Sequence, residues 1–136
     1  MIVLDTNVLS EALRPEPSAK VLDWLRSQPI TDLFTTTIAE AEFYCGLALL
    51  PKGKRRRSLE SIVEPIFTQD LAGRVLPFDR LAARDYAHIA ASRRHAGRPI
   101  CESDARIAAI VRSCRAATRN VDDFADCGLK VVDPRL

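Results

Sequence analysis

The stretch Ile2-Val3-Leu4-Asp5-Thr6-Asn7 sets three apolar residues directly before three polar ones. A short apolar run that ends in polar side chains is typical of a buried strand with the polar residues at its carboxyl end. In open α/β sheets, ligands bind at the carboxyl ends of the strands. Asp5 is therefore the first candidate site residue, with Thr6 and Asn7 as candidate helpers. The competing interpretation of Asp5 is a helix N-cap for the segment that follows.

Short apolar runs alternate with longer helical segments along the rest of the chain. The pattern predicts strands at 33–36, 74–78, 116–118 and 130–132, and helices at 18–27, 37–50, 58–71, 79–96 and 103–115. Strands that alternate with longer helices indicate an α/β fold with a mostly parallel sheet. We see no linker, so residues 1–136 are expected to form one domain.

Composition narrows the class of protein. The 136 residues are 47% hydrophobic and 28% charged, which is ordinary for a globular domain and excludes a disordered chain. No apolar run reaches the roughly 18 residues of a membrane span, and the start lacks a basic signal-peptide region, so we expect a cytoplasmic protein. Four cysteines without a C-x-x-C pair do not suit zinc, and we expect buried free thiols at Cys45, Cys101, Cys114 and Cys127.

The charged residues are unevenly distributed. Net charge is only +2, but bases cluster at 52–57 and again at 93–98. Several acids stand in apolar surroundings instead of among these bases. This distribution favours a polyanionic substrate and a cation-dependent site.

Glu42 is the second candidate. Thr37 and Glu40 fit a helix capping box, which gives Glu40 a structural role. At about 100° per residue, Glu42 falls about 40° from Ile38, close to Leu49, whereas Glu40 falls about 200° away. Glu42 thus interrupts an apolar stripe, where a carboxylate needs either a buried salt bridge or a function.

Two later regions repeat the pattern. Asp104 leads an apolar helical stripe containing Ile107, Ala108 and Val111, although an acid in a first turn can simply favour the helix dipole. Polar residues also follow the strand predicted at 116–118, and their plain interpretation is a solvated turn. They are Thr118, Asn120, Asp122 and Asp123.

Acids gathered at one sheet edge repel each other, and Mg²⁺ or Mn²⁺ relieves that repulsion. Such metals activate water for phosphodiester cleavage, and nearby Lys and Arg would hold the phosphate backbone. The sequence contains no G-x-S-x-G, P-loop or G-x-G-x-x-G motif. A phosphoacceptor signalling module is disfavoured, because the only late lysine is Lys130.

Four short motifs stand in the order and spacing of a known family. They are Ile2–Glu11, Ala41-Glu42-x-x-x-Gly46, Asp104-x-x-Ile107-Ala108-Ala109 and Thr118-Arg119-Asn120-x-x-Asp123-Phe124. With the closing Val131-Val132-Asp133-Pro134, they resemble PIN-domain proteins over essentially the whole chain, and VapC-type toxins of the FitB/NtrR-like group most. The resemblance implies an α/β/α sandwich with a short, mostly parallel central sheet surrounded by helices.

The resemblance also implies a Mg²⁺- or Mn²⁺-dependent endoribonuclease, the toxin of a VapBC-type pair, with metal-activated water cleaving RNA. It implies a homodimer, neutralised by a VapB-like antitoxin that also binds operator DNA. By position, Asp5, Glu42 and Asp104 match the family's acidic triad, and all three would be metal ligands.

The position of the family's fourth acid differs from the FitB-like motif in this sequence. Where FitB-like proteins carry an acid directly after Thr-Arg, this chain has Asn120, so Asp123 is chosen as the fourth catalytic acid and metal ligand. Thr118, Asn120 and Asp122 are candidate helpers. The segment before Thr118 is also shorter than usual for the family. These departures leave open an alternative, a catalytically weak PIN protein that acts by binding RNA or its antitoxin.

Overall fold

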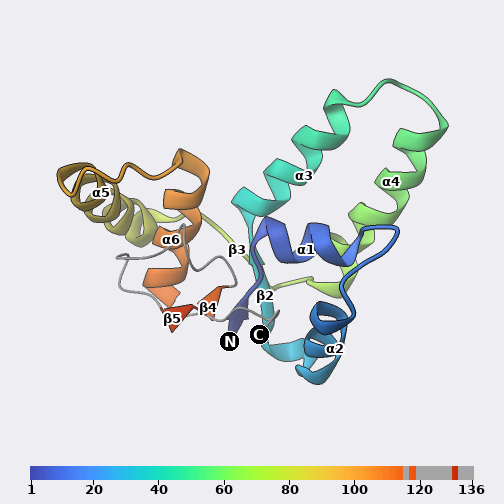
Figure 1. Cartoon of the computed structure of the whole chain (residues 1–136), viewed down its shortest axis with the longest axis horizontal. Helices are drawn as coiled ribbons and strands as arrows, with labels where there is room; N and C mark the ends of the chain where they lie inside the picture. The colour runs from blue at the N-terminus through green and yellow to red at the C-terminus, as the bar shows by residue number, and fades with distance from the viewer. Residues whose placement is uncertain (115–116, 119–129, 132–136) are drawn as a thin grey trace.

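The computed structural model describes residues 1–114, 117–118 and 130–131 (Figure 1). The strands are β1 (Ile2–Val3), β2 (Leu33–Thr36), β3 (Val75–Leu76), β4 (Ala117–Thr118) and β5 (Lys130–Val131). The helices are α1 (Thr6–Ala12), α2 (Ala19–Ser27), α3 (Thr37–Leu49), α4 (Lys54–Pro65), α5 (Arg80–His95) and α6 (Glu102–Cys114). A short 3-10 turn, η1 (Ile30–Asp32), precedes β2, and a π-helical segment, η2 (Ile66–Asp70), continues α4.

The strands pair in parallel, as the alternation of strands and helices predicts. β2 lies between β1 and β3, with Ile2 opposite Leu33 and Thr35 opposite Val75. β4 pairs with β5, also in parallel. Parallel neighbours bring the carboxyl ends of β1 and β2 to the same edge of the sheet, and α1 and α3 start there.

Successive residues along β1 and the extended residue after it pack into two separate cores. The reason is that side chains of an extended segment alternate between the two faces of a sheet. Val3 packs into a cluster with α5 and α6, whereas Leu4 packs into a cluster with α1, α2 and α4. Phe34 and Leu33 divide between the same two clusters. Figure 1 shows the result, with α5 and α6 on one side of the sheet and α1 to α4 on the other. The predicted α/β/α sandwich is confirmed.

Side-chain caps fix where three helices begin. Asp5 caps α1, and Asp79 caps α5 by accepting from the backbone N–H of Ala82 at 2.9 Å. Thr36 caps α3, accepting from the N–H of Ala39 at 3.1 Å. The predicted capping box of Thr37 and Glu40 is therefore wrong by one residue. Buried Thr36 is still part of β2 and turns the chain from strand to helix.

The basic segment at 52–57 is mostly helical. The sequence predicts a helix from residue 58, but α4 begins at Lys54, after Gly53. Most of the cluster therefore lies on the first turn of α4, where Arg56 pairs with Glu60 at 2.7 Å. In the described part of the chain, no helix is both long and apolar enough to cross a membrane.

A buried hydroxyl ties β2 to the end of β1. The Thr35 side chain is fully buried, and its Oγ1 donates to the carbonyl oxygen of Leu4 at 2.9 Å. The N–H of Leu4 in turn donates to the carbonyl of Phe34 at 2.7 Å. These bonds hold the backbone directly before Asp5.

We expect Thr35→Val to lower the free energy of unfolding by about 1–3 kcal/mol, because it leaves a buried acceptor without its donor. Thr68→Val is the matched control. The Thr68 hydroxyl donates to Glu64 at an exposed position, so its loss should change stability by no more than about 0.5 kcal/mol. Urea denaturation of both variants measures the difference, and equal stabilities would contradict this role of Thr35.

Candidate active site

A cavity of about 330 Å³ opens at the carboxyl end of β1. Three acids from separate parts of the chain line it, namely Asp5, Glu42 and Asp104. Among the described residues, Thr6, Asn7, Cys101 and Ile107 complete the lining. Acids up to 99 positions apart in the sequence thus meet at the sheet edge where the strand pattern predicts a site.

Asp5 is the most deeply buried of the three acids, with 3% of its surface exposed. Its Oδ1 accepts from the N–H of Val8 at 2.9 Å, which caps α1. Both sequence interpretations of Asp5 therefore hold at once, since it is an N-cap and lines the acidic cavity. The cap fixes the carboxylate in place, and the N-terminus of α1 favours its negative charge.

Glu42 reaches the cavity from the second turn of α3. Its Oε2 accepts a hydrogen bond from the Oγ1 of Thr6, which joins α3 to α1 across the cavity. The predicted apolar stripe around Glu42 is wrong, because Cys45 is exposed and Leu49 is 81% exposed. The buried residues of α3 are Ala39 and Leu47. Glu42 therefore stands at the edge of the buried face, where a carboxylate can meet both a partner and solvent.

Glu40, two residues before Glu42 on α3, has different neighbours from Glu42. Partial burial raises the pKa of the Tyr44 hydroxyl, and the charges of Glu40 and Glu64 raise it further. Glu40 therefore acts on the α3–α4 side of the molecule, and it does not line the acidic cavity. The two glutamates of α3 differ in surroundings, as their helical spacing predicts.

Asp104 lies in the first turn of α6 and is half-buried. The stripe that follows it behaves as predicted, because Ile107, Ala108 and Val111 are all buried in the core beside α5. The packed side of α6 therefore anchors the helix, and its first turn presents Asp104 to the cavity.

The predicted fourth acid lies outside the described residues. Asp123, Asn120 and Asp122 all fall in that part of the chain. Thr118 is in β4, of which only the backbone is described. Asp123 as fourth ligand therefore stays a prediction.

The donor set of the cavity suits a hard cation. Three carboxylates, a hydroxyl and an amide supply oxygen atoms, which Mg²⁺ and Mn²⁺ prefer as ligands. The acids do not converge on one point, since no three His, Cys, Asp or Glu side chains of the described residues form a ready metal cluster. Mg²⁺ still fits, because it usually keeps several waters and takes only one or two carboxylates directly.

Cys101 is a lining residue that the sequence pattern does not single out. The sequence predicts buried thiols, but Cys45 and Cys101 are exposed and Cys114 is half-buried; all three are free, and Cys127 lies outside the described residues. The prediction fails because it rests on the general burial of cysteine. Cys101 stands one residue before α6 and three before Asp104. This proximity to a candidate site residue was the sequence signal that could have placed Cys101 at the cavity.

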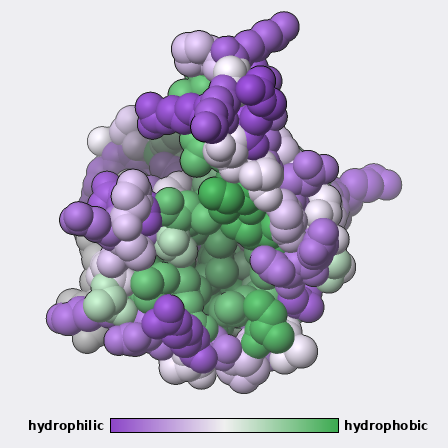
Figure 2. Space-filling view, turned by 90° about the vertical axis from the view of Figure 1, so that its right-hand side faces the viewer, coloured by the Kyte–Doolittle hydropathy of each residue, from purple (hydrophilic) through white to green (hydrophobic). Residues whose placement is uncertain are grey.

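An apolar groove of about 360 Å³ adjoins the acidic cavity, and Thr6 and Glu42 line both. Leu13 of α1, Leu47 of α3 and Leu59 of α4 form much of its apolar wall, with Arg55 at its edge. On this side of the molecule, Figure 2 shows apolar residues gathered in a hollow with hydrophilic residues around it.

Comparison with known proteins places the chain in a family. The family model for the PIN domain matches residues 2–126. The VapC ribonuclease Y4jK of Sinorhizobium fredii is 42% identical, over 98% of this chain and 97% of that protein. Toxin FitB of Neisseria gonorrhoeae is 39% identical, over 98% of both chains. A solved structure of FitAB bound to an IR36 DNA fragment superposes with a TM-score of 0.92 and 36% identity, covering 100% of this chain and 96% of that one. The chain therefore belongs to the PIN-domain family, among relatives that include VapC and FitB proteins.

Proposed function

We propose that this protein is a metal-dependent endoribonuclease and the toxin of a VapBC-type toxin–antitoxin pair. One observation carries the proposal. In a PIN-family chain, three acids from separate elements, Asp5, Glu42 and Asp104, line a single cavity that also carries a hydroxyl and an amide. Acids gathered around one cavity repel one another, and a bound divalent cation relieves that repulsion, so the arrangement is expected to serve a cation-dependent reaction.

Asp5 and Asp104 would be the principal ligands of Mg²⁺ or Mn²⁺, with Glu42 and Asp123 completing the set. When bound, such a cation lowers the pKa of water and stabilises charge on phosphoryl oxygens. The chain's own residues fix the geometry. Val8 holds the Asp5 carboxylate by its N–H, and Thr6 holds Glu42 by its hydroxyl. Held in this way, both acids are oriented before substrate arrives.

RNA would be held by bases outside the cavity. Lys54, Arg55 and Arg57 are exposed on the first turn of α4, and Arg55 borders the groove that adjoins Glu42. Arg and Lys along a groove that adjoins an acidic site bind phosphates and offset the repulsion between RNA and the carboxylates. Exposed Asn7 lies on the cavity lining, where its amide can donate to a phosphate oxygen.

A VapB-like antitoxin is the proposed inhibitory partner. The structurally similar FitB chain is found as FitAB on DNA, so we expect a two-protein complex that binds operator DNA here as well. The apolar groove beside Glu42 offers a surface for an antitoxin segment. We further propose that residues 1–136 form one PIN-like domain and that the toxin is a homodimer.

The alternative function is a catalytically weak PIN protein that binds RNA or its antitoxin. One observation favours it, namely that no ready three-ligand metal cluster exists among the described residues. Cleavage assays separate the two functions directly.

The central prediction of the proposal is metal-dependent cleavage. Purified protein should cut single-stranded RNA with Mg²⁺ or Mn²⁺, should lose that activity in EDTA, and should not regain it with Zn²⁺. Asp5→Asn should abolish cleavage and remain folded, because Asn is as good an N-cap as Asp and can accept from Val8 in the same way.

Gel analysis of labelled RNA measures the cleavage, and thermal melting checks the fold. Cleavage that persists in the Asp5→Asn preparation would come from a contaminating nuclease. Cleavage by the unmodified protein that survives exhaustive chelation, with none in the variant, would contradict the metal-dependent mechanism.

The two glutamates of α3 give a matched pair. Glu42→Gln should lower kcat by at least about 100-fold, because it removes a negative charge from the cavity while an amide oxygen can still accept from Thr6. Glu40→Gln, two residues away, should leave kcat within about twofold, at a cost near 0.3–1 kcal/mol in helix stability. Steady-state kinetics with one RNA compares them, and similar losses in both would remove Glu42 from the reaction.

The basic turn of α4 should affect binding rather than chemistry. Arg55→Glu with Arg57→Glu is expected to raise KM and to flatten the salt dependence of RNA binding, because fewer counterions are released. Arg56 is left intact because it pairs with Glu60. Acids in this first turn favour the helix dipole, so stability should hold. Fluorescence anisotropy at several salt concentrations measures the slope; an unchanged slope would assign these residues to another surface.

A further inference from the structure

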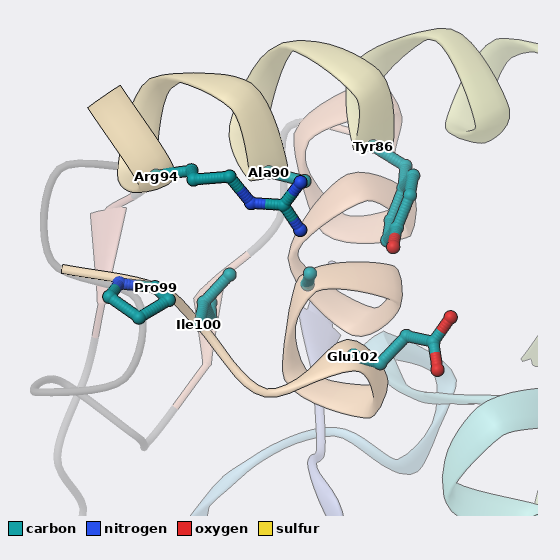
Figure 3. Close-up of a pocket in the computed structure, with 7 residues that line it drawn as sticks. Tyr86, Ala90, Arg94, Pro99, Ile100 and Glu102 are labelled. Carbon is teal, nitrogen blue, oxygen red and sulfur yellow. The ribbon is translucent and has the colours of Figure 1, made fainter. Parts of the chain in front are cut away.

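A second, smaller cavity lies beside the acidic one. It has a volume of about 180 Å³ and opens between α5, the segment at Pro99 and Ile100, and the first turn of α6 (Figure 3). α5 supplies Tyr86 and Arg94, and α6 supplies Glu102. None of these residues has a role in the proposed metal site.

The first turn of α6 separates the two cavities. Asp104 lines the acidic cavity, whereas Glu102 and Ala105 line the smaller one. Residues two apart on a helix point about 200° apart and lie about 3 Å apart along its axis. Because the two cavities share this turn, a strand whose phosphate sits at Asp104 can cross the turn and place a neighbouring base in the smaller cavity.

Two side chains of α5 form a surface that suits a flat ring. Tyr86 is half-buried, and Phe78 meets it edge-on with ring centroids 6.1 Å apart, which holds the phenol in place. The Arg94 guanidinium extends over the cavity toward Tyr86 in Figure 3, and it makes no ion pair within the described ranges of the chain. Unpaired RNA bases stack on aromatic rings and on guanidinium planes.

The Glu102 carboxylate favours a nucleobase over an inorganic anion as the ligand of this cavity. Its Oε1 accepts from Arg106 at 2.7 Å, which orients the carboxylate and leaves further lone pairs to accept hydrogen bonds. An inorganic phosphate would gain from Arg94 but offers few hydrogen-bond donors to the Glu102 carboxylate. The edge of a nucleobase presents donors and acceptors together, so it can satisfy Glu102 and Arg94 at the same time.

The volume of the smaller cavity indicates which size of nucleobase it can hold. An enclosed protein cavity of about 150 Å³ accepts benzene, so this open cavity of about 180 Å³ has room for one substituted six-membered ring, and a fused purine would project from it. We propose that this cavity is a base-specificity subsite, which takes an unpaired pyrimidine of the RNA strand next to the phosphate at the acidic cavity. Arg94 donates to its ring carbonyl, Glu102 accepts from its N–H donor, and Tyr86 forms the aromatic wall.

This inference rests on the proposed nuclease function, and the test separates the two. A randomised single-stranded RNA pool is cut with Mg²⁺ or Mn²⁺, and the product ends are sequenced. The unmodified protein should favour a pyrimidine at one position beside the cut. Arg94→Ala should reduce that preference at least about tenfold while metal-dependent cutting continues. Ala90→Leu, which fills the cavity without changing charge, should do the same.

The matched control is Arg84→Ala, an exposed arginine on the same helix that does not line the cavity; its preference should equal that of the unmodified protein. A second readout needs no turnover. Cytidine monophosphate should shift the amide NMR signals of Ala90 and Glu102, whereas inorganic phosphate and adenosine monophosphate should not.

The possible results of these experiments distinguish failure of the nuclease proposal from failure of the subsite. Absence of cutting by the unmodified protein overturns the nuclease proposal, and the subsite with it. Metal-dependent cutting with no pyrimidine preference, or with a preference that Arg94→Ala and Ala90→Leu leave intact, overturns the subsite alone. Shifts produced equally by phosphate would assign Arg94 to an anion instead of a base, and would also overturn it.

Discussion

The buried carboxylate of Asp5 is the constraint on which the rest of the site depends. An isolated ionised carboxylate in a protein interior is strongly disfavoured, so its surroundings have to stabilise it. The N–H of Val8 and the start of α1 do so on one side. Two further acids, Glu42 and Asp104, line the same cavity. Three acids around one cavity suit a divalent cation, and this connects the fold to the chemistry that we propose.

The sandwich brings these acids together by simple means. Thr35 and Phe34 pin the backbone on either side of Leu4, which places Asp5 at the sheet edge. The end of β2 turns at Thr36 directly into α3, and α6 is anchored against α5 through its buried stripe. Each acid therefore sits near the start of a helix that packs mainly through residues outside the cavity. Substitutions in the cavity should affect activity more than stability for this reason.

The sequence predicts the sheet edge and the helix starts well because these depend on local patterns. Asp5 and Asp104 follow from an apolar run and an apolar stripe that the structure contains. Glu42 lines the expected cavity, but the stripe used to find it is exposed at Leu49. The reason is tertiary: α3 packs through Ala39 and Leu47, and Thr6, 36 residues away, selects Glu42 as its partner. Cys101 and the cavity at Arg94 also depend on contacts between elements distant in sequence, which no local period encodes.

The two cavities divide the proposed reaction between them, with the first turn of α6 as their common wall. The acidic cavity holds the groups for chemistry, and the cavity at Tyr86 holds groups suited to reading a base. The most direct test of the central claim is the position of Mn²⁺, located by anomalous scattering in crystals of the intact protein. The account predicts one or two Mn²⁺ ions in the acidic cavity, bound by Asp5 and Asp104. Mn²⁺ bound only elsewhere, with that cavity empty at saturating metal, would contradict it.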